Sequence, residues 1–188
     1  MGNVVNIKQK ETTMKMTRQK SIELIGHIDK AMKHEGVIFG IAMVDNKEAC
    51  EKIKRQMETV VKPSEAYEKY DTERLALCTE LAPKDDKGQP VRKIADAPPG
   101  TPQGMMYFEY VGLTDNPKWE PRFKALCEQH KDALEARKKQ IEDVEKALLE
   151  EVEIELQTVK LSDVPPKLSG AEIEPLRFLI VNDLNGKK

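Results

Sequence analysis

Apolar residues near the start of the chain recur at helical spacing. They lie three or four positions apart, at Ile22, Ile25, Ile28 and Met32. This spacing puts them on one face and predicts an amphipathic helix. The next segment, 37–44, is apolar or small throughout, which suits a buried strand or a helix. We expect a helix, because the segment runs without a turn signal into a strongly helical stretch.

Two longer stretches, 46–82 and 118–149, carry the heptad pattern of a coiled coil, in which core positions alternate spacings of four and three. The core positions are Asn46, Cys50, Ile53, Met57, Val60, Ser64, Tyr67, Asp71, Arg74, Cys78 and Leu81 in the first stretch, and Trp119, Phe123, Leu126, His130, Leu134, Arg137, Ile141, Val144 and Leu148 in the second. Each stretch predicts a long helix. Pro63 predicts a kink or a break in the first helix, because proline lacks the N–H that a helix interior needs.

Alternation with a period of two marks a different kind of element after the second helix. In 151–156 the apolar residues Val152, Ile154 and Leu156 face one way and three glutamates face the other. This pattern predicts a half-buried strand. Residues 14–17 also alternate and form a second, shorter candidate strand.

The stretch between the two long helices is rich in proline and glycine. Its segments 90–94 and 105–111 flank a turn-forming sequence and predict a β-hairpin. Near the C-terminus, Ser169 and Glu172 have the spacing of a capping box, which predicts a short closing helix.

These elements predict a protein that is mainly α with a small β element (α+β). At its centre we expect an antiparallel hairpin of two long helices, capped by a β-hairpin and accompanied by a short N-terminal helix, a C-terminal strand and a closing helix. The expected parts are a flexible leader at 1–13 and a single elongated domain at 14–188, which contains the helical hairpin at 37–82 and 118–149, the β-hairpin tip at 83–117, and the C-terminal strand and helix at 150–184.

Three short motifs resemble a family of small uncharacterised bacteriophage proteins. The chain reads Lys-Asp-Asp-Lys-Gly-Gln-Pro at 84–90, Leu-Leu-Glu-Glu-Val-Glu-Ile at 148–154 and Leu-Ser-Gly-Ala-Glu-Ile at 168–173. The family is similar in having a Lys-Asp-x-x-Gly-x-Pro turn, a Leu-Leu-x-Glu-Glu-Val-x-Ile strand and a final Ser-Gly-x-x-hydrophobic element. The likeness covers 14–182 and departs at the proline-rich insert 95–104. It implies a phage genome and a helical hairpin, and it supplies no catalytic residues.

Composition narrows the classes of function. Charged residues make up 34% of the chain and aromatic residues 5%, against a typical charged share of about 25%, so the core must be thin relative to the surface. With 31 basic and 33 acidic residues the net charge is −2. This balance argues against a general nucleic-acid binder, which carries a basic surface, and against a DNA mimic, which is far more acidic.

Cysteines and hydropathy bear on the compartment. Cys50, Cys78 and Cys127 are odd in number and widely spaced, with no CxxC pair, so we expect reduced thiols in the host cytoplasm. No apolar run approaches the roughly 20 residues that span a bilayer. Phosphate-binding, dinucleotide-binding, hydrolase and metal-ligand motifs do not occur in the sequence. We therefore expect no cofactor, no metal and no enzymatic activity.

An antiparallel pairing of the two seams would align polar positions as well as apolar ones. Because both seams follow one period, residue i should lie opposite about 201 − i. The aligned pairs include Met57 with Val144, Val60 with Ile141, Asp71 with His130, and Ser64 with Arg137. One interpretation makes the aspartate and the histidine an acid–base pair or half of a metal site. The interpretation that we favour is a polar layer that fixes the register of the hairpin.

Two surfaces are candidates for binding a partner. The first is the strand at the hairpin tip, within 95–111, because methionine and aromatic residues are enriched at protein interfaces. Its candidate residues are Met105, Met106, Tyr107, Phe108 and Tyr110. The alternative is that one face of this strand packs on Trp119 and Leu81, while the other face still needs an explanation.

The second surface is the acidic concentration within 142–155, which includes Glu150, Glu151 and Glu153. Such a surface attracts a basic partner. The alternative is a solvated face whose charges keep an exposed strand from aggregating.

Together these features favour a phage-encoded, non-enzymatic protein-interaction protein, with assembly or structural support as its expected role. The alternative is an inhibitor or regulator of a host protein such as a defence or replication factor. We expect a protein partner from the phage or the host, and neither a membrane nor a nucleic acid. Homo-oligomerisation is a further alternative, because exposed heptad seams could also pair between chains.

Overall fold

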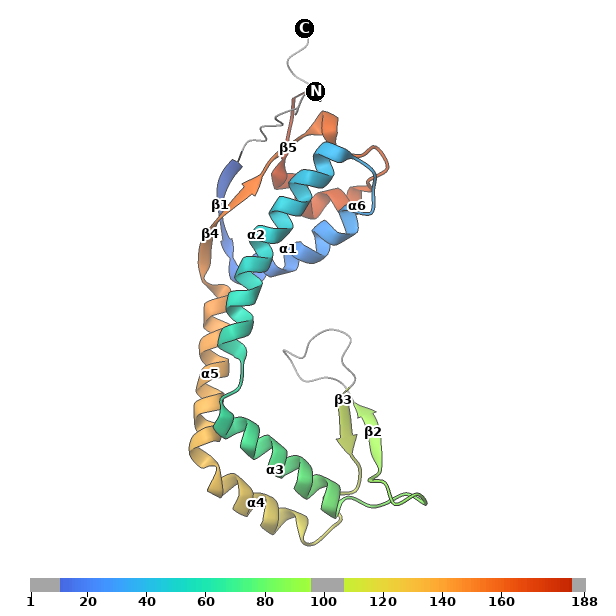
Figure 1. Cartoon of the computed structure of the whole chain (residues 1–188), viewed down its shortest axis with the longest axis vertical. Coiled ribbons are helices and arrows are strands. Elements are labelled where there is room, and N and C mark those ends of the chain that lie inside the picture. The colour runs from blue at the N-terminus through green and yellow to red at the C-terminus, as the bar shows by residue number, and fades with distance from the viewer. Residues whose placement is uncertain (1–10, 96–106, 184–188) are drawn as a thin grey trace, which may run out of the picture. The chain divides into compact units, whose positions relative to one another are not determined.

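The computed structural model describes residues 11–95 and 107–183 (Figure 1). The protein is mainly α with a small β element, as the sequence predicts. The helices are α1 (Arg18–Ala31), α2 (Val37–Val61), α3 (Glu65–Leu81), α4 (Trp119–Gln129), α5 (Lys131–Leu149) and α6 (Gly170–Ile173), with short 3₁₀ helices η1 (Leu161–Asp163) and η2 (Glu174–Leu179). The strands are β1 (Glu11–Thr17), β2 (Arg92–Ala95), β3 (Tyr107–Tyr110), β4 (Glu151–Gln157), β5 (Val159–Lys160) and β6 (Ile180–Val181).

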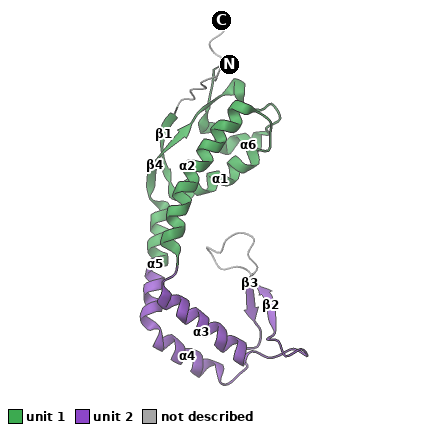
Figure 2. Ribbon diagram, in the orientation of Figure 1, with its two compact units in different colours: residues 1–62, 141–188 green, residues 63–140 purple. Residues whose placement is uncertain are grey.

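Contacts divide the chain into two compact units (Figure 2). Unit 1 comprises 1–62 and 141–188, and unit 2 comprises 63–140. The sequence interpretation had treated 14–188 as a single domain. The periodicity of the helices gives no sign of a division, because each seam continues across the boundary between the units.

The core of unit 1 lies where α1 and α2 pack against the ribbon formed by β1 and β4. The two strands pair antiparallel, with Met16 opposite Val152 and Met14 opposite Ile154. The buried residues of this core are Met16, Leu24, Ile28, Ala31, Phe39, Ala42, Met43, Cys50, Ile154, Leu156, Val159, Leu168, Leu176 and Leu179. Helical and strand periodicities therefore meet in one apolar cluster, as the patterns of both segments require.

The strand predicted at 151–156 is confirmed as β4, which buries its apolar side chains and exposes the glutamates between them. Its partner β1 begins at Glu11 rather than at the predicted residue 14. The prediction of a flexible leader at 1–13 is therefore wrong for residues 11–13, which belong to β1. The reason is the register, because Glu11 lies opposite Gln157 and the pairing continues as far as β4 offers a partner.

The helix expected at 37–44 is confirmed as the start of α2, and the break expected at Pro63 is confirmed as well. α2 ends at Val61. Ser64 then adopts an extended conformation, and its hydroxyl accepts a hydrogen bond from the backbone N–H of Tyr67 at 3.3 Å. This side-chain cap satisfies one of the free donors at the start of α3, so the proline separates two well-formed helices.

The prediction of one continuous helix over 118–149 is wrong, because the segment forms the two helices α4 and α5. They are separated at His130, whose φ of −109° and ψ of 21° lie outside the helical region. At this position Nε2 of His130 lies 2.9 Å from Oε2 of Glu73. A heptad pattern describes only the spacing of side chains. A helix break that preserves this spacing therefore cannot be predicted from the pattern.

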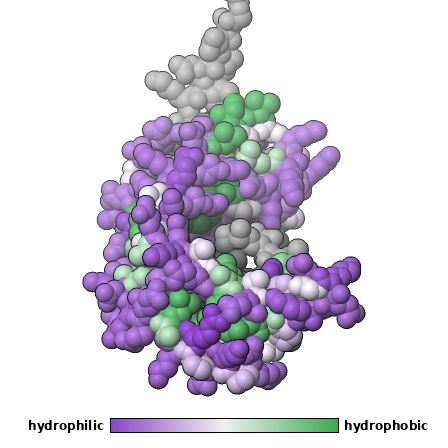
Figure 3. Space-filling view, turned by 60° about the horizontal axis from the view of Figure 1, so that its bottom comes forward, coloured by the Kyte–Doolittle hydropathy of each residue, from purple (hydrophilic) through white to green (hydrophobic). Residues whose placement is uncertain are grey.

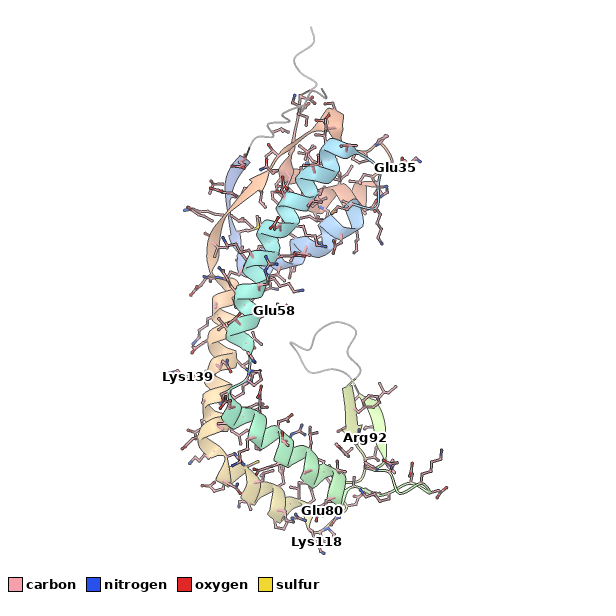
Figure 4. All side chains as sticks on the ribbon, viewed as in Figure 1. Glu35, Glu58, Glu80, Arg92, Lys118 and Lys139 are labelled. Carbon is pink, nitrogen blue, oxygen red and sulfur yellow. The ribbon has the colours of Figure 1, made fainter. Side chains whose placement is uncertain are left out.

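In unit 2, one set of contacts joins the end of α3 to the start of α4. The Nδ2 atom of Asn116 donates to the carbonyl of Leu81 at 2.9 Å, and Arg122 pairs with Glu80. Hydrogen bonds from Arg122, together with the charge of nearby Lys118, hold the pKa of Glu80 below its usual range (Figure 4). These contacts fix the position from which the β-hairpin emerges.

The predicted β-hairpin is confirmed as β2 and β3, which pair antiparallel with Ile94 opposite Phe108. The two turns that flank this hairpin require glycine. Gly88 and Gly112 have φ values of 74° and 73°, a region that side chains disfavour. A Cβ atom at Gly112 would also lie 3.0 Å from Cγ of Pro83. The hairpin is therefore attached to unit 2 through backbone that only glycine adopts without strain.

The closing helix is confirmed at α6, including its capping box. The Ser169 hydroxyl caps the N–H of Glu172, and the Glu172 carboxylate accepts from the backbone N–H of Ser169. The same carboxylate lies 3.1 Å from Nε2 of His34, which follows α1. Pro175 ends the α-helical hydrogen bonding, and the segment continues as the 3₁₀ helix η2. The cap thus connects the C-terminal segment to the first helix.

Asn46 is the fully buried polar side chain that joins α2 to β4. Its Nδ2 atom donates to the carbonyl of Gln157 at 3.0 Å, and its Oδ1 atom accepts from the N–H of Gln157 at 2.6 Å. The side-chain amide of Asn46 therefore forms the two hydrogen bonds that the backbone of a neighbouring strand would otherwise form with Gln157. The sequence had placed Asn46 on the helical seam and had assigned it no such role.

We expect Asn46→Ala to destabilise the protein by about 3 kcal/mol, because both backbone groups of Gln157 would lose their partner in a buried site. Urea unfolding followed by circular dichroism measures this change. The control is Glu48→Ala on the exposed face of α2, which should change stability by less than about 0.5 kcal/mol. Equal effects of the two substitutions would contradict the proposed role of Asn46.

Glu172 should make the protein sensitive to acid. Hydrogen bonds from the Ser169 hydroxyl, then from its backbone N–H and from His34, lower the pKa of Glu172 from 4.5 to about 2. The stability that this carboxylate contributes is complete above pH 4.5, because it is then ionised in both the folded and the unfolded chain. It is lost as the pH falls toward 2.

Glu172→Gln should therefore flatten the dependence of the melting temperature on pH between 4.5 and 2. Glu174→Gln, an exposed neighbour, is the matched control and should leave the slope as it is. An unchanged slope in the Glu172 variant would show that the capping box does not contribute to the acid response.

Candidate functional site

An open groove in unit 2 brings together aromatic side chains from β3 and α4 with apolar side chains from α3. α3 contributes Leu75 and Cys78, β3 contributes Phe108 and Tyr110, and α4 contributes Trp119 and Phe123. We call these six residues the aromatic groove, whose volume is about 490 Å³. Arg74 and Lys93 also line it. The groove thus has an aromatic floor with cationic groups at its margin.

Contacts within unit 2 hold the aromatic rings in place. Trp119 and Phe123, one helical turn apart on α4, stack with their ring centroids 4.8 Å apart. The hydroxyl of Tyr110 lies 2.9 Å from Oγ1 of Thr79, which connects the hairpin to α3. The guanidinium of Arg92, on β2 (Figure 4), lies 4.9 Å from the centroid of the Tyr110 ring. The hairpin is therefore anchored to α3 through Tyr110, and Arg92 covers the ring that makes this contact.

Apolar side chains at the margin of the groove remain exposed. Phe108 is 45% exposed and Ile94, its partner across the hairpin, is 69% exposed. Leu75 and Val111 are exposed as well. Figure 3 shows hydrophobic surface as separate patches within a mostly hydrophilic face of the molecule. A solvent-exposed apolar cross-strand pair is typical of a protein interaction surface and not of a hydrophobic core.

The structure clarifies which predicted tip residues form this groove. Met105 and Met106 lie outside the described residues, and Tyr107 is described only through its backbone pairing with Ala95. Phe108 and Tyr110 share one face of β3, as the alternation predicted.

The two predicted alternatives for the hairpin tip, packing and exposure, both occur on that one face. Tyr110 is fixed against Thr79, whereas Phe108 is left exposed. Sequence reasoning missed Ile94 and Leu75 as parts of the same surface. Ile94 could have been found from the hairpin register, but Leu75 lies off the heptad seam and gave no signal.

The second candidate surface is the exposed face of the β1–β4 ribbon in unit 1. Glu150 pairs with Arg18 at 2.7 Å and Glu153 pairs with Lys15 at 3.5 Å. Glu151 is exposed on the same strand. Two of the three predicted acidic residues are thus partly neutralised by the first strand and helix.

The predicted polar layer exists in part, but its partners are different. His130 lies against Glu73 rather than Asp71, and Asp71 forms an ion pair with Arg74 at 2.7 Å. The predicted pairing of Asp71 with His130 is therefore wrong. The reason is that α4 ends at His130, and the changed backbone turns the imidazole toward a neighbouring position of α3.

The other polar members have separate roles. Ser64 caps α3 through Tyr67. The Arg137 guanidinium donates to Gln140 at 2.7 Å and lies 5.5 Å from the Tyr67 ring centroid. Met57 and Val144, an aligned apolar pair, are both buried. The direct pairing of Ser64 with Arg137 stays a prediction.

Tyr70 is a titratable residue beside this layer. Tyr70 lies edge-on to the His130 ring at 5.7 Å, and its hydroxyl lies 3.9 Å from the Sγ atom of Cys127. Burial, reinforced by Cys127, raises the pKa of Tyr70 to about 12. In the core of unit 1, burial raises the pKa of the Cys50 thiol to about 11. Groups with such pKa values are protonated and weakly nucleophilic at neutral pH.

Within the described residues, no group of three or more histidine, cysteine, aspartate or glutamate side chains could hold a metal ion. Over the same residues, no helix combines the length and the apolar character needed to cross a membrane. Comparisons of the chain with protein-family models, with curated proteins and with solved structures gave no match.

Replacing His130 with leucine should lower stability by about 1 kcal/mol, because a hydrogen bond to a partly exposed carboxylate contributes about that much. Urea unfolding measures the change, and far-ultraviolet circular dichroism checks that helicity is retained. Glu128→Leu, at an exposed neighbouring position, is the control. Loss of partner binding in a His130 variant that stays folded would instead favour a direct functional role for this histidine.

Proposed function

We propose that this chain is a non-enzymatic protein-interaction protein that binds a protein partner through the aromatic groove. The observation that carries the proposal is the cross-strand pair of Ile94 and Phe108, which is anchored below by Tyr110 yet left exposed to solvent. A rigid base with an exposed apolar pair is the arrangement of interface hot spots, which lie in well-fixed surroundings and become desolvated on binding.

The chemistry around the groove favours a protein over other ligands. Aromatic residues and arginine are the types enriched at protein interfaces. The apolar surface continues past the groove to Ile94, farther than a small ligand bound beside Trp119 would cover. Arg74 and Lys93 border the groove, but Lys93 is paired with Glu109 at 3.0 Å and Arg74 with Asp71. The groove therefore lacks the row of unpaired cations that phosphate backbones require.

The resemblance to small bacteriophage proteins favours a role inside the infected host cell, in assembly or as a structural accessory. An inhibitor or regulator of a host protein would use the same groove. The two roles differ in the partner rather than in the surface, so a capture experiment separates them.

Capture from a lysate of infected cells tests the proposal. The tagged full-length chain should retain a defined protein, and Ile94→Ser combined with Phe108→Ser should weaken that interaction by roughly 30-fold or more, as for hot-spot residues. Recovery of virion or tail proteins would support assembly, and recovery of a host enzyme would support inhibition.

The matched control is Val37→Ser combined with Val181→Ser, which replaces exposed apolar residues of unit 1. It should leave capture unchanged. Equal capture by both double variants, with melting temperatures like that of the unmodified chain, would exclude the aromatic groove as the binding surface.

A further inference from the structure

One edge of β4 has no strand beside it. β4 pairs with β1 along one edge, and the described residues place no strand at the other. The backbone N–H and C=O of Gln157 point away from β1, because both are bonded to Asn46 of α2. Backbone groups of an antiparallel strand alternate in direction with a period of two. Those of Glu153 and Glu155 therefore point to the same unpaired side.

A groove of about 910 Å³ lies between the β1–β4 ribbon and α2, within unit 1, and β1 contributes Glu11 and Thr13 to its lining. The β4 side is formed by residues 152–155 and Gln157. On the α2 side, Ala49 and Ile53 are partly buried and pack against the core, which gives the groove an apolar floor. An extended chain that lay along β4 could therefore place alternate side chains on apolar surface.

The rim of this groove is predominantly acidic. Its lining includes five carboxylates and three cationic side chains: Glu11, Asp45, Glu48, Glu153 and Glu155 against Arg18, Lys52 and Arg55. Glu155 lies opposite Thr13 in the ribbon, whereas Glu153 has Lys15 as a partner at 3.5 Å. Arg18 is already paired with Glu150. Opposite charges at neighbouring positions of adjacent strands attract, so a strand added here would gain from basic residues.

Gln157 supplies an independent sign that the groove is incomplete. Its Nε2 atom donates to Glu11 at 3.0 Å, but its Oε1 atom is buried and has no hydrogen-bond partner. Among the described residues that are not exposed, it is the sole buried side-chain oxygen or nitrogen in this condition. A buried acceptor without a donor costs free energy, and a donor from a chain bound in the groove would remove that cost.

We propose that the free edge of β4 binds an extended segment of a partner protein in which apolar and basic residues alternate. Its backbone pairs with Glu153 and Glu155, its apolar side chains face Ala49 and Ile53, and its basic side chains lie beside the glutamates. A second copy of β4 does not fit this edge, because two such strands would bring rows of glutamate together and repel. This surface is separate from the aromatic groove.

A labelled synthetic peptide of alternating valine and lysine provides the first test, with the full-length chain and fluorescence anisotropy as the readout. The peptide should bind more tightly than a scrambled peptide of equal composition and than one that alternates valine with glutamate. On binding, the backbone amides of Glu153 and Glu155 should become protected in hydrogen exchange, since they then donate to the added strand.

Two variants test the contacts. Glu153→Gln combined with Glu155→Lys should weaken binding about tenfold, because favourable cross-strand charges are lost or reversed. Glu142→Gln combined with Glu145→Lys makes the same change of charge on exposed positions of α5 and should have little effect. Glu155→Pro removes one outward N–H without removing a bond to β1, so it should weaken binding in a folded protein.

Equal affinity for the scrambled and the alternating peptides would overturn the proposal, because it would show attraction by charge without strand pairing. Unchanged exchange of the two amides in the complex would also overturn it. So would a wild-type dimer that protects the same amides in the absence of peptide, since the edge would then bind a second copy of the chain.

Discussion

Unit 1 depends on the two hydrogen bonds between the Asn46 side chain and the backbone of Gln157. α2 can pack its apolar face on β4 only if the backbone groups at the end of that strand keep a partner. The amide of Asn46 provides the donor and the acceptor together, at 3.0 and 2.6 Å. An apolar residue at this position would bury the same area but leave the strand unsatisfied, so the helix seam must contain one polar residue here.

In unit 2 the comparable constraint is the attachment of the hairpin. Two turns with positive φ at glycine and the contact between Tyr110 and Thr79 fix the hairpin beside α3. The strands are short, and a two-stranded hairpin is marginal without support. Because the support is confined to one end, the exposed apolar pair farther along the strands is held without being buried.

Periodicity predicted most elements of the fold, because helices and strands of a small protein must bury one face. The start of α2, the break at Pro63, the strand β4 and the capping box of α6 all followed from spacing and from residues with a fixed local preference. The break at His130 did not, since it preserves the heptad spacing; His130 lies there against Glu73 on another helix. Of the candidate site, the sequence identified Phe108 and Tyr110. It could not identify Leu75, whose exposure is decided by tertiary packing.

The division of the chain has a consequence for how the protein is made. Unit 2 is continuous in sequence, whereas unit 1 is assembled from 1–62 and 141–188. On a ribosome, which releases the chain from its N-terminus, β1 and α2 emerge well before β4 exists. Their apolar faces must stay uncovered while 63–140 is synthesised. Until Gln157 is available to Asn46, the first third of the chain therefore keeps part of its apolar surface exposed.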